Sequence, residues 1–362
     1  MTKAKTCLAL LTAVACLPYL TLKVIWLCGG RAGIPEGSPL LDGGTTLWTV
    51  NALTVAMDAT VILLVLALIR PWGRRLPAAW LLLPLWCACG LLGPIVVAFP
   101  VQQLYAALSG GPGTGQASGA DGSRMAASDL LDGWVWTLVY TGFLAQAVTL
   151  SALFVLHVRD RWGTLLRARL SELPLPSRGR GVRRGWFALG ALAALIPAVM
   201  HAMWALGSQA GLSGTSAARS GSDSRITNAA FLFFALLAVA GAARLAGSRA
   251  EGRRGGARLW GPLAAAWAGS GTLACWGGWL LMGALSAAGK PAGQRATAAM
   301  EGVYSVQALA GLLIAGLATQ VLVLRARALP AGGGQDATVT ALEGTALEAT
   351  AREETAPAAS RV

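Results

Sequence analysis

The sequence predicts an all-α integral membrane protein with eight transmembrane helices, arranged as two parallel four-helix repeats. Three observations predict this fold class. Eight long apolar runs divide the chain, charged residues make up only 12% of it, and arginines gather on alternate connections between the runs. Ordinary soluble domains have ~25% charged residues. Because the hydrocarbon core of a bilayer cannot hydrogen-bond a backbone, long apolar runs inside it must be helical.

Each run has about the 20 residues that a transmembrane helix needs. The connections between the runs are too short to hold a separate globular core. The runs lie at 6–28, 47–69, 78–99, 133–157, 186–207, 226–246, 259–286 and 302–324.

Residues 1–157 contain the first four runs and form the first predicted membrane half. The first run follows Lys3 and Lys5, and Ala13-Val14-Ala15 within it resembles the cleavage site of a signal peptide. The run continues through Leu27, which is long for the apolar part of a signal peptide. We therefore interpret it as a membrane span, with cleavage as the alternative.

Residues 158–185 form a predicted cytoplasmic loop that holds eight arginines. We interpret it as a loop that only sets the topology; because Leu165, Leu166 and Leu170 have helical spacing, an amphipathic turn on the anionic inner leaflet is the alternative. Residues 186–329 form the second four-helix membrane half. Residues 330–362 have too little apolar surface to fold alone, which predicts a disordered cytoplasmic tail.

Basic residues predict the orientation. One side of the membrane receives 20 of the Lys and Arg side chains, from the amino terminus, the second, fourth and sixth connections and the end of the last run, whereas the other side receives six. The excess of positive charge places this side, and both termini, in the cytoplasm. The net charge of +13 then indicates contact with the lipid bilayer and its anionic inner-leaflet lipids. The sequence has no compact basic domain of the kind that would indicate binding to nucleic acid.

The two halves resemble each other. LPYLTLKVIWLCGGRAGI at 17–34 aligns with LIPAVMHAMWALGSQAGL at 195–212, which pairs Lys23 with His201 and Trp26 with Trp204. Asn51 aligns with Asn228 further along. An even number of spans in each copy predicts a pseudo-two-fold axis along the membrane normal. Chance similarity between helices rich in Ala, Leu, Gly and Trp is the alternative.

Asp58 is the strongest candidate for a functional residue, because it lies in the middle of the second run. A charged side chain there costs at least ~2.5–3.5 kcal/mol, so it requires a partner, a proton or a water-filled pocket. Lys23, in the first run, can supply the partner. In the alternative, Lys23 extends outward to the interface, and a neutral Asp58 forms a structural hydrogen bond with Asn51 or Thr54.

His201 is a further intramembrane polar candidate, either a hydrogen-bonded packing residue or part of a proton path. The small residues Gly190, Ala194, Ala198 and Ala202 form one stripe at helical spacing, and Ala266, Ser270, Ala274 and Gly278 form another. Small residues let helices approach closely in lipid. We interpret both stripes as internal packing seams, with dimer contacts as the alternative.

The sequence gives no sign of an enzyme. It contains no G-x-S-x-G, H-E-x-x-H or Walker motif. All six cysteines lie in or beside apolar runs, and Cys87 and Cys89 have no His or acidic neighbours, so we predict no metal, no cofactor and no disulfide framework.

The abundance of Ala, Gly and Arg, the scarcity of Lys and the segment LPYLTLKVIWLCGGRAGI resemble multi-pass membrane proteins of high-GC actinobacteria. The resemblance implies a bacterial plasma-membrane location and assigns no role to any residue. Repeat architecture and costly midspan polarity favour a carrier or permease-like transporter with a polar site near Asp58. The alternative is a membrane scaffold or signalling protein with an unknown protein partner.

Overall fold

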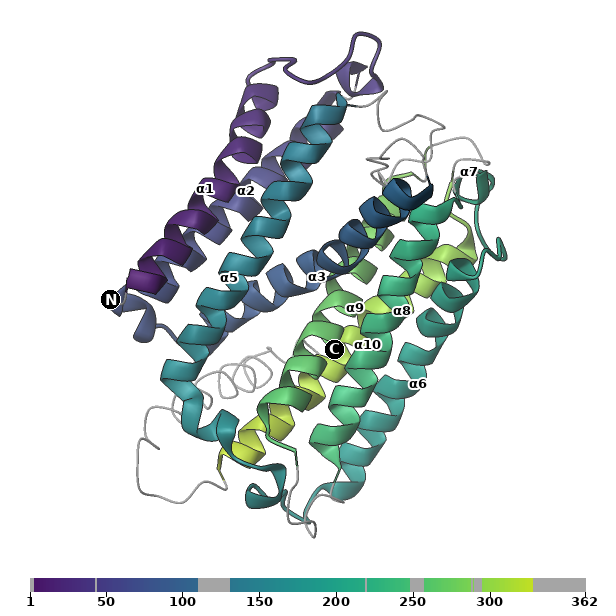
Figure 1. The fold of residues 1–362 in the computed structure, drawn as a ribbon. Helices are drawn as coiled ribbons and strands as arrows, with labels where there is room; N and C mark the ends of the chain where they lie inside the picture. The colour runs from purple at the N-terminus through teal and green to yellow at the C-terminus, as the bar shows by residue number, and fades with distance from the viewer. Residues whose placement is uncertain are drawn as a thin grey trace, which may run out of the picture.

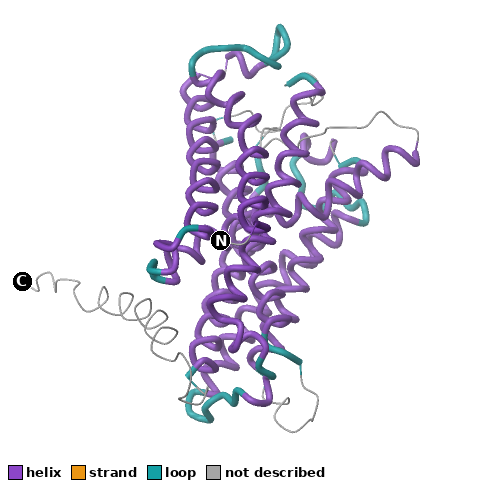
Figure 2. The backbone as a smooth tube through the Cα atoms, turned by 60° about the vertical axis from the view of Figure 1, so that its left-hand side comes forward, coloured by secondary structure: helices purple, strands orange, loops and turns teal. Residues whose placement is uncertain are grey.

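The chain forms a bundle of long helices that lie side by side in a computed structural model (Figure 1; Figure 2). The structure describes residues 3–42, 44–109, 131–218, 220–247, 257–287, 289 and 295–327. Within these ranges every named element is a helix. This confirms the all-α class. The predicted tail at 330–362 lies outside the described residues.

The first half consists of four long helices that coincide with the first four apolar runs. They are α1 (Lys3–Leu27), α2 (Gly44–Ile69), α3 (Ala78–Ser109) and α5 (Gly133–Arg167), with short 3₁₀ turns η1 (Pro39–Asp42) and η2 (Pro71–Arg74) in the connections. Long helices follow because each run is apolar all round, as expected for a helix that has lipid or protein on every side.

The second half also contains four long helices. It consists of α6 (Arg180–Ala205), α8 (Ser222–Ala246), α9 (Trp260–Ser286) and α10 (Ala298–Ala326), with the short helices η3 (Leu170–Glu172) and α7 (Gly214–Ala218) before α6 and α8. Among the described residues, seven helices are long and apolar enough to cross a membrane, namely all of the long ones except α9. A multi-pass membrane protein is therefore what the fold indicates.

Helix α9 is the most enclosed helix of the second half. Its main neighbours are α10, α8 and α3. Glycines allow its backbone to touch its neighbours: a Cβ added at Gly311 of α10 would lie 2.3 Å from the backbone nitrogen of Ala274, and one at Gly241 of α8 would lie 2.4 Å from that of Ala266. Of the two predicted seams, the one through Ala266, Ser270 and Ala274 is thus an internal contact.

Helix α3 leaves its own half and crosses to the other (Figure 1). It packs more extensively against α9 than against α5 or α2. At the crossing, a Cβ on Gly90 would lie 2.4 Å from the backbone of Gly271. The Trp276 indole donates to the carbonyl of Leu91 at 2.9 Å, and the Trp86 indole donates to Ser270 at 3.1 Å. Helix α3 therefore joins the two halves.

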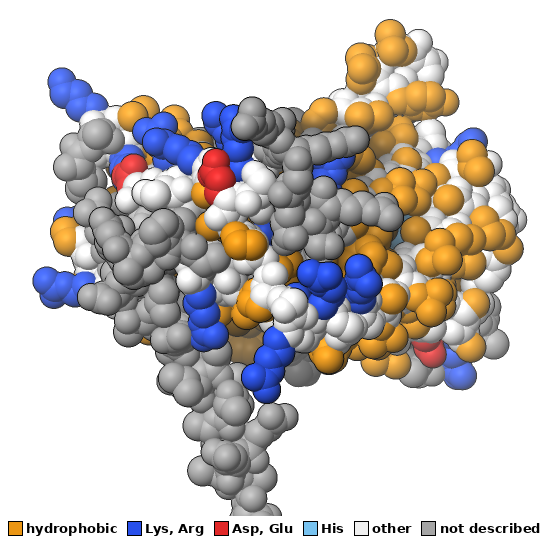
Figure 3. Space-filling model, turned by 90° about the horizontal axis from the view of Figure 1, so that it is seen from below, with side chains coloured by type: hydrophobic (Ala, Val, Ile, Leu, Met, Phe, Trp, Pro, Cys, Tyr) orange, Lys and Arg blue, Asp and Glu red, His pale blue; other side chains and the backbone are white. Residues whose placement is uncertain are grey.

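The basic connections meet at one end of the bundle, the lower end in Figure 1, whose Lys and Arg side chains are seen in Figure 3. Lys5 forms an ion pair with Asp160 at 2.6 Å, and Arg161 donates to the carbonyl of Leu76 at 3.2 Å. The backbone nitrogen of Leu170 donates to Ala257 at 3.0 Å. These contacts tie the amino terminus and the three basic connections to a single end.

The connection between α5 and α6 differs from the predicted loop at 158–185. Helix α5 continues to Arg167 and α6 begins at Arg180. Leu165 and Leu170 are 4% and 2% exposed and belong to the main core, as do Leu173 and Leu175. The interpretation that Leu165 and Leu170 lie on the inner leaflet is therefore wrong: these leucines bury their side chains in protein instead.

Arg325 fastens this connection to the core. It is 2% exposed, and its guanidinium donates to the carbonyl of Leu170 at 3.1 Å, to that of Leu173, and to that of Leu245 at 2.8 Å. The arginine lies in the last turn of α10, so three segments distant in sequence are held by one side chain. Charged hydrogen bonds to backbone carbonyls satisfy this buried cation.

Candidate functional site

Lys23 of α1 is held inside the first half. The side chain is 9% exposed, and its ammonium nitrogen donates to the Asn51 side-chain oxygen of α2 at 2.7 Å. The same nitrogen lies 5.0 Å from the ring centre of Tyr19 and 4.9 Å from that of Trp26. Aromatic faces attract a cation, and more strongly where water is excluded. The lysine therefore points inward, and the interpretation in which it extends to the membrane interface is wrong.

Asp58 lies two helical turns beyond Asn51 on the same side of α2. It is 5% exposed, and its Oδ2 atom is buried without a hydrogen-bond partner. The carboxyl interacts electrostatically with Lys23, Tyr19 and Cys16 of α1. A buried carboxyl without a hydrogen bond is costly, so this group carries an unsatisfied polar atom in the middle of a long helix.

Neither predicted bond of Asp58 forms. Lys23 and Asp58 are not a direct ion pair, because Asn51 accepts the lysine's hydrogen bond. Asn51 does not bond Asp58, and the Thr54 hydroxyl donates to the Asn51 backbone carbonyl at 2.9 Å instead. Lys23, Asn51 and Asp58 do lie near one another, whereas His201 lies in the second half, and the ammonium bonds the Asn51 amide rather than the carboxyl.

His201 is the residue that the sequence alignment pairs with Lys23. His201 of α6 is 1% exposed. Its Nδ1 atom lies 2.7 Å from the side-chain oxygen of Asn228 on α8, and its Nε2 atom lies 2.8 Å from that of Gln307 on α10. Trp204 and Phe231 surround the ring, with centroids 5.3 and 5.0 Å away. This histidine therefore joins three helices by side-chain hydrogen bonds.

The hydrogen bonds around His201 fix its tautomer. The Asn228 amide nitrogen donates to the Ser224 carbonyl at 2.8 Å, so the Asn228 oxygen faces the ring and Nδ1 carries the proton. In a neutral imidazole Nε2 is then an acceptor. The Gln307 amide nitrogen is buried without a partner, and turning this amide by 180° brings that nitrogen to Nε2 as a donor. A neutral His201 thus gains both of its hydrogen bonds.

The segments that follow these residues have the same geometry in both halves. The Trp26 indole donates to the Ala32 carbonyl at 2.8 Å, and the Trp204 indole donates to the Ala210 carbonyl at 2.9 Å. In each half the chain then turns through two glycines with left-handed backbone, a conformation that only glycine adopts readily. Their φ angles are 86° at Gly29, 93° at Gly207, 71° at Gly33 and 77° at Gly211.

Sequence reasoning did not identify the aromatic partners of the lysine. Tyr19 and Trp26 lie four residues before and three residues after Lys23, which is the spacing that places side chains on one helix face. That spacing was the available signal. The position of Gln307 opposite His201 had no comparable signal, because it depends on how α10 packs against α6.

Comparison with protein families, with curated proteins and with solved structures finds no match for this chain. The class that the fold and the site define is a helical multi-pass membrane protein with a buried polar constellation in each half.

Proposed function

We propose that the protein is a carrier or permease-like transporter of the bacterial plasma membrane, and that its site is the constellation of Lys23, Asn51 and Asp58. One observation carries the proposal: Asp58 is buried in the middle of a span and its Oδ2 atom has no hydrogen-bond partner. Such a group costs several kcal/mol unless something neutralises it. We infer that a proton or a cationic solute does so during the transport cycle.

The proposal includes eight spans, with α9 as the eighth. Helix α9 carries no Asp, Glu, Lys or Arg, and its hydropathy is lowered by Gly, Ser, Thr and Trp. Since α9 is largely enclosed by α8, α10 and α3, it needs less apolar surface than a helix facing lipid. Both termini then lie on the same side, and the basic residues gathered at that end of the bundle support a cytoplasmic location for it.

The proposal also includes two parallel repeats. The bond from Lys23 to Asn51 and the bond from His201 to Asn228 are both 2.7 Å long and join the first and second helices of each half. The tryptophan bonds and the glycine turns that follow support the same correspondence. Parallel repeats occur in known transporters, which supports the transporter class, although here the constellation of Lys23, Asn51 and Asp58 lies within the first half.

Proteoliposome flux tests the proposal. The purified full-length protein is reconstituted with an internal pH indicator, and a potassium diffusion potential drives proton entry. We expect wild-type protein to conduct protons and Asp58→Asn to lower the rate about tenfold or more, a change equivalent to ~1.4 kcal/mol in the barrier. Asp160→Asn, which removes an exposed carboxylate at the basic end, is the matched control and keeps the wild-type rate.

Two outcomes contradict the proposal. The assay is repeated with each common amino acid, sugar and metal cation as the solute. Wild-type flux equal to that of empty liposomes in every case would exclude a transport function. Unchanged flux in Asp58→Asn would remove this carboxyl from the mechanism.

A membrane scaffold is the second candidate, and the backbone contacts favour it. A Cβ at Gly277 would lie 2.5 Å from Ala308, and one at Gly269 would lie 2.4 Å from Ala238. Helices in such contact resist the relative motion that a carrier needs. A scaffold predicts that a disulfide engineered between α9 and α10 leaves every cellular phenotype of the protein intact.

A further inference from the structure

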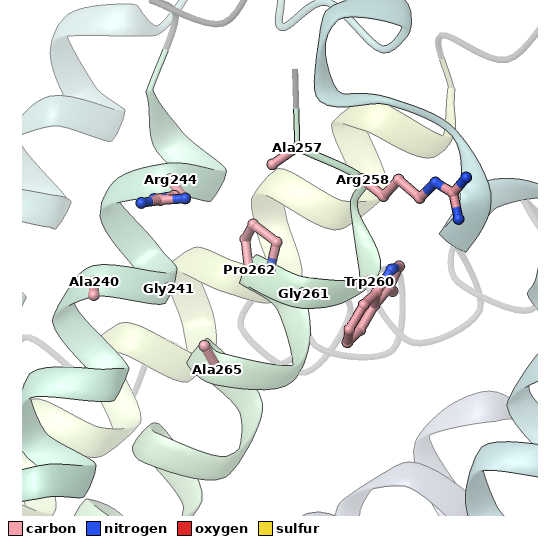
Figure 4. A pocket seen from close by; sticks show the side chains of 9 residues that line it. All are labelled: Ala240, Gly241, Arg244, Ala257, Arg258, Trp260, Gly261, Pro262 and Ala265. Carbon is pink, nitrogen blue, oxygen red and sulfur yellow. The ribbon is translucent and has the colours of Figure 1, made fainter. Parts of the chain in front are cut away.

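A pocket opens at the basic end of the second half, between the last turns of α8 and the start of α9 (Figure 4). Its volume is about 540 Å³, within the range of sites for small ligands. Arg244 and Gly241 of α8 line one side of it, and Trp260, Pro262 and Ala265 of α9 line the other, where the Arg258 side chain extends away from Arg244 (Figure 4).

Both arginines are available to a ligand. Arg244 and Arg258 are exposed, and neither side chain forms an ion pair or a hydrogen bond within the described chain. The two arginines that are buried at this end of the described chain, in contrast, already have partners. Arg183 donates to the carbonyls of Arg178 and Pro176, and Arg325 donates to those of Leu170 and Leu245. Two free guanidinium groups on one pocket attract an anion with several oxygen acceptors.

The start of α9 adds backbone donors to the same pocket. No side chain caps this helix, and the N–H groups of Trp260 and Gly261 have no hydrogen-bond partner in the described chain. The helix is 27 residues long. Free N–H groups and the positive end of the helix dipole favour a phosphate at this point.

The remaining walls suit a hydrocarbon chain. Ala240 and Ala265 present only methyl groups, and a Cβ on Gly261 would meet no atom within 4 Å. Trp260 is 58% exposed, which is the placement of a tryptophan at a membrane interface. The pocket thus has a cationic part at the end of the bundle and an apolar part that continues along the helices.

We propose that this pocket binds one anionic glycerophospholipid. The phosphodiester accepts from the N–H groups at the start of α9 and lies beside Arg244, and the exposed Arg258 side chain turns toward it from the outward position seen in Figure 4; one acyl chain lies over Ala240 and Ala265. A membrane-bound phosphodiester is favoured over a soluble phosphate because the apolar walls lie directly beside the cationic ones. This inference does not rest on transport, since it concerns the opposite half from Asp58.

Lipid binding to the purified full-length protein tests the inference. Native mass spectrometry in detergent counts lipids retained during titration with phosphatidylglycerol or with phosphatidylcholine of the same acyl chains. We expect phosphatidylglycerol to bind as one tight equivalent, and Arg244→Gln with Arg258→Gln to weaken it about tenfold. The matched control is Arg180→Gln with Arg184→Gln, which removes the same charge from exposed positions at the same end and leaves the affinity within twofold.

A second variant tests the apolar part without changing charge. Ala240→Phe fills the pocket from an exposed position on α8, so we expect it to lower phosphatidylglycerol retention as well. Equal loss in the pocket and control variants would overturn the site in favour of general surface charge. Equal binding of the two lipids, or full competition by millimolar glycerol 3-phosphate, would overturn the phospholipid as the occupant.

Discussion

The two halves of the chain begin a buried polar constellation in the same way and complete it differently. In each, a cationic or titratable side chain on the first helix bonds an asparagine on the second. The second half adds Gln307 from its last helix and has the buried Ala235 at the position of Asp58. In the described part of the first half, the buried Gln146 of α5 forms no hydrogen bond with Lys23, and the acid is kept. The comparison indicates a node with both hydrogen bonds formed in the second half and one that leaves a carboxyl oxygen unpartnered in the first.

The packing of the third helix follows the same division. Helix α9 lies within its own half, whereas α3 crosses to the other half and touches Gly271. Spans α1, α2 and α5 therefore lack the enclosing neighbour that α9 provides for α6, α8 and α10. A half with fewer internal contacts has a lower free energy of local opening, which is what a moving part requires.

Overpacking the crossing between the halves should have the largest effect. Gly90→Val would place its Cβ 2.4 Å from the backbone of Gly271, so one helix must move. We expect the free energy of unfolding to fall by about 2–3 kcal/mol. Thermal unfolding in detergent measures this, with Gly316→Val as the control because a Cβ there meets nothing within 4 Å. An equal loss in both variants would show only the general cost of a branched residue.

Breaking the node of the second half should have an intermediate effect. His201→Leu removes two side-chain hydrogen bonds and leaves Asn228 and Gln307 without a shared partner. We expect a loss of about 1–2 kcal/mol in the free energy of unfolding and no change in proton flux. The measurement pairs denaturation in mixed micelles with the liposome assay. Loss of flux in a variant that stays folded would move the transport site to the second half.

Removing the unsatisfied acid should have the smallest effect, and of the opposite sign. Asp58→Leu replaces a buried carboxyl whose Oδ2 atom has no partner, so we expect the free energy of unfolding to rise by about 1 kcal/mol while flux is lost. The same denaturation assay measures it, with Thr60→Leu on the exposed side of α2 as the control. A destabilised Asp58→Leu would show that the carboxyl has a structural partner in the membrane.

Much of the fold could be predicted because hydrocarbon imposes simple rules on sequence. Every apolar run coincides with a long helix, and the basic connections lie at one end. The alignment of Lys23 with His201 and of Asn51 with Asn228 indicated which residues share a position, but not that Lys23 bonds Asn51 in place of Asp58. A lysine, an amide and an acid within two helical turns permit several pairings, and the choice depends on helix rotation.

Other features could not be predicted because they arise from contacts between distant segments. Arg325 belongs to the basic residues that set the predicted topology, yet it is buried and bonds three carbonyls. The crossing of α3 depends on Gly90 meeting Gly271, and neither glycine differs in its local sequence from the many others of the chain. Leu165 and Leu170 have a periodicity that fits a lipid surface and a protein core equally well.

Arg325 links the end of α10 to two segments that are distant from it in sequence. Its guanidinium donates to carbonyls in the last turn of α8 and in the connection between α5 and α6. Replacing this arginine would therefore withdraw a donor from the Leu170, Leu173 and Leu245 carbonyls at once, and the ends of three segments would be loosened together.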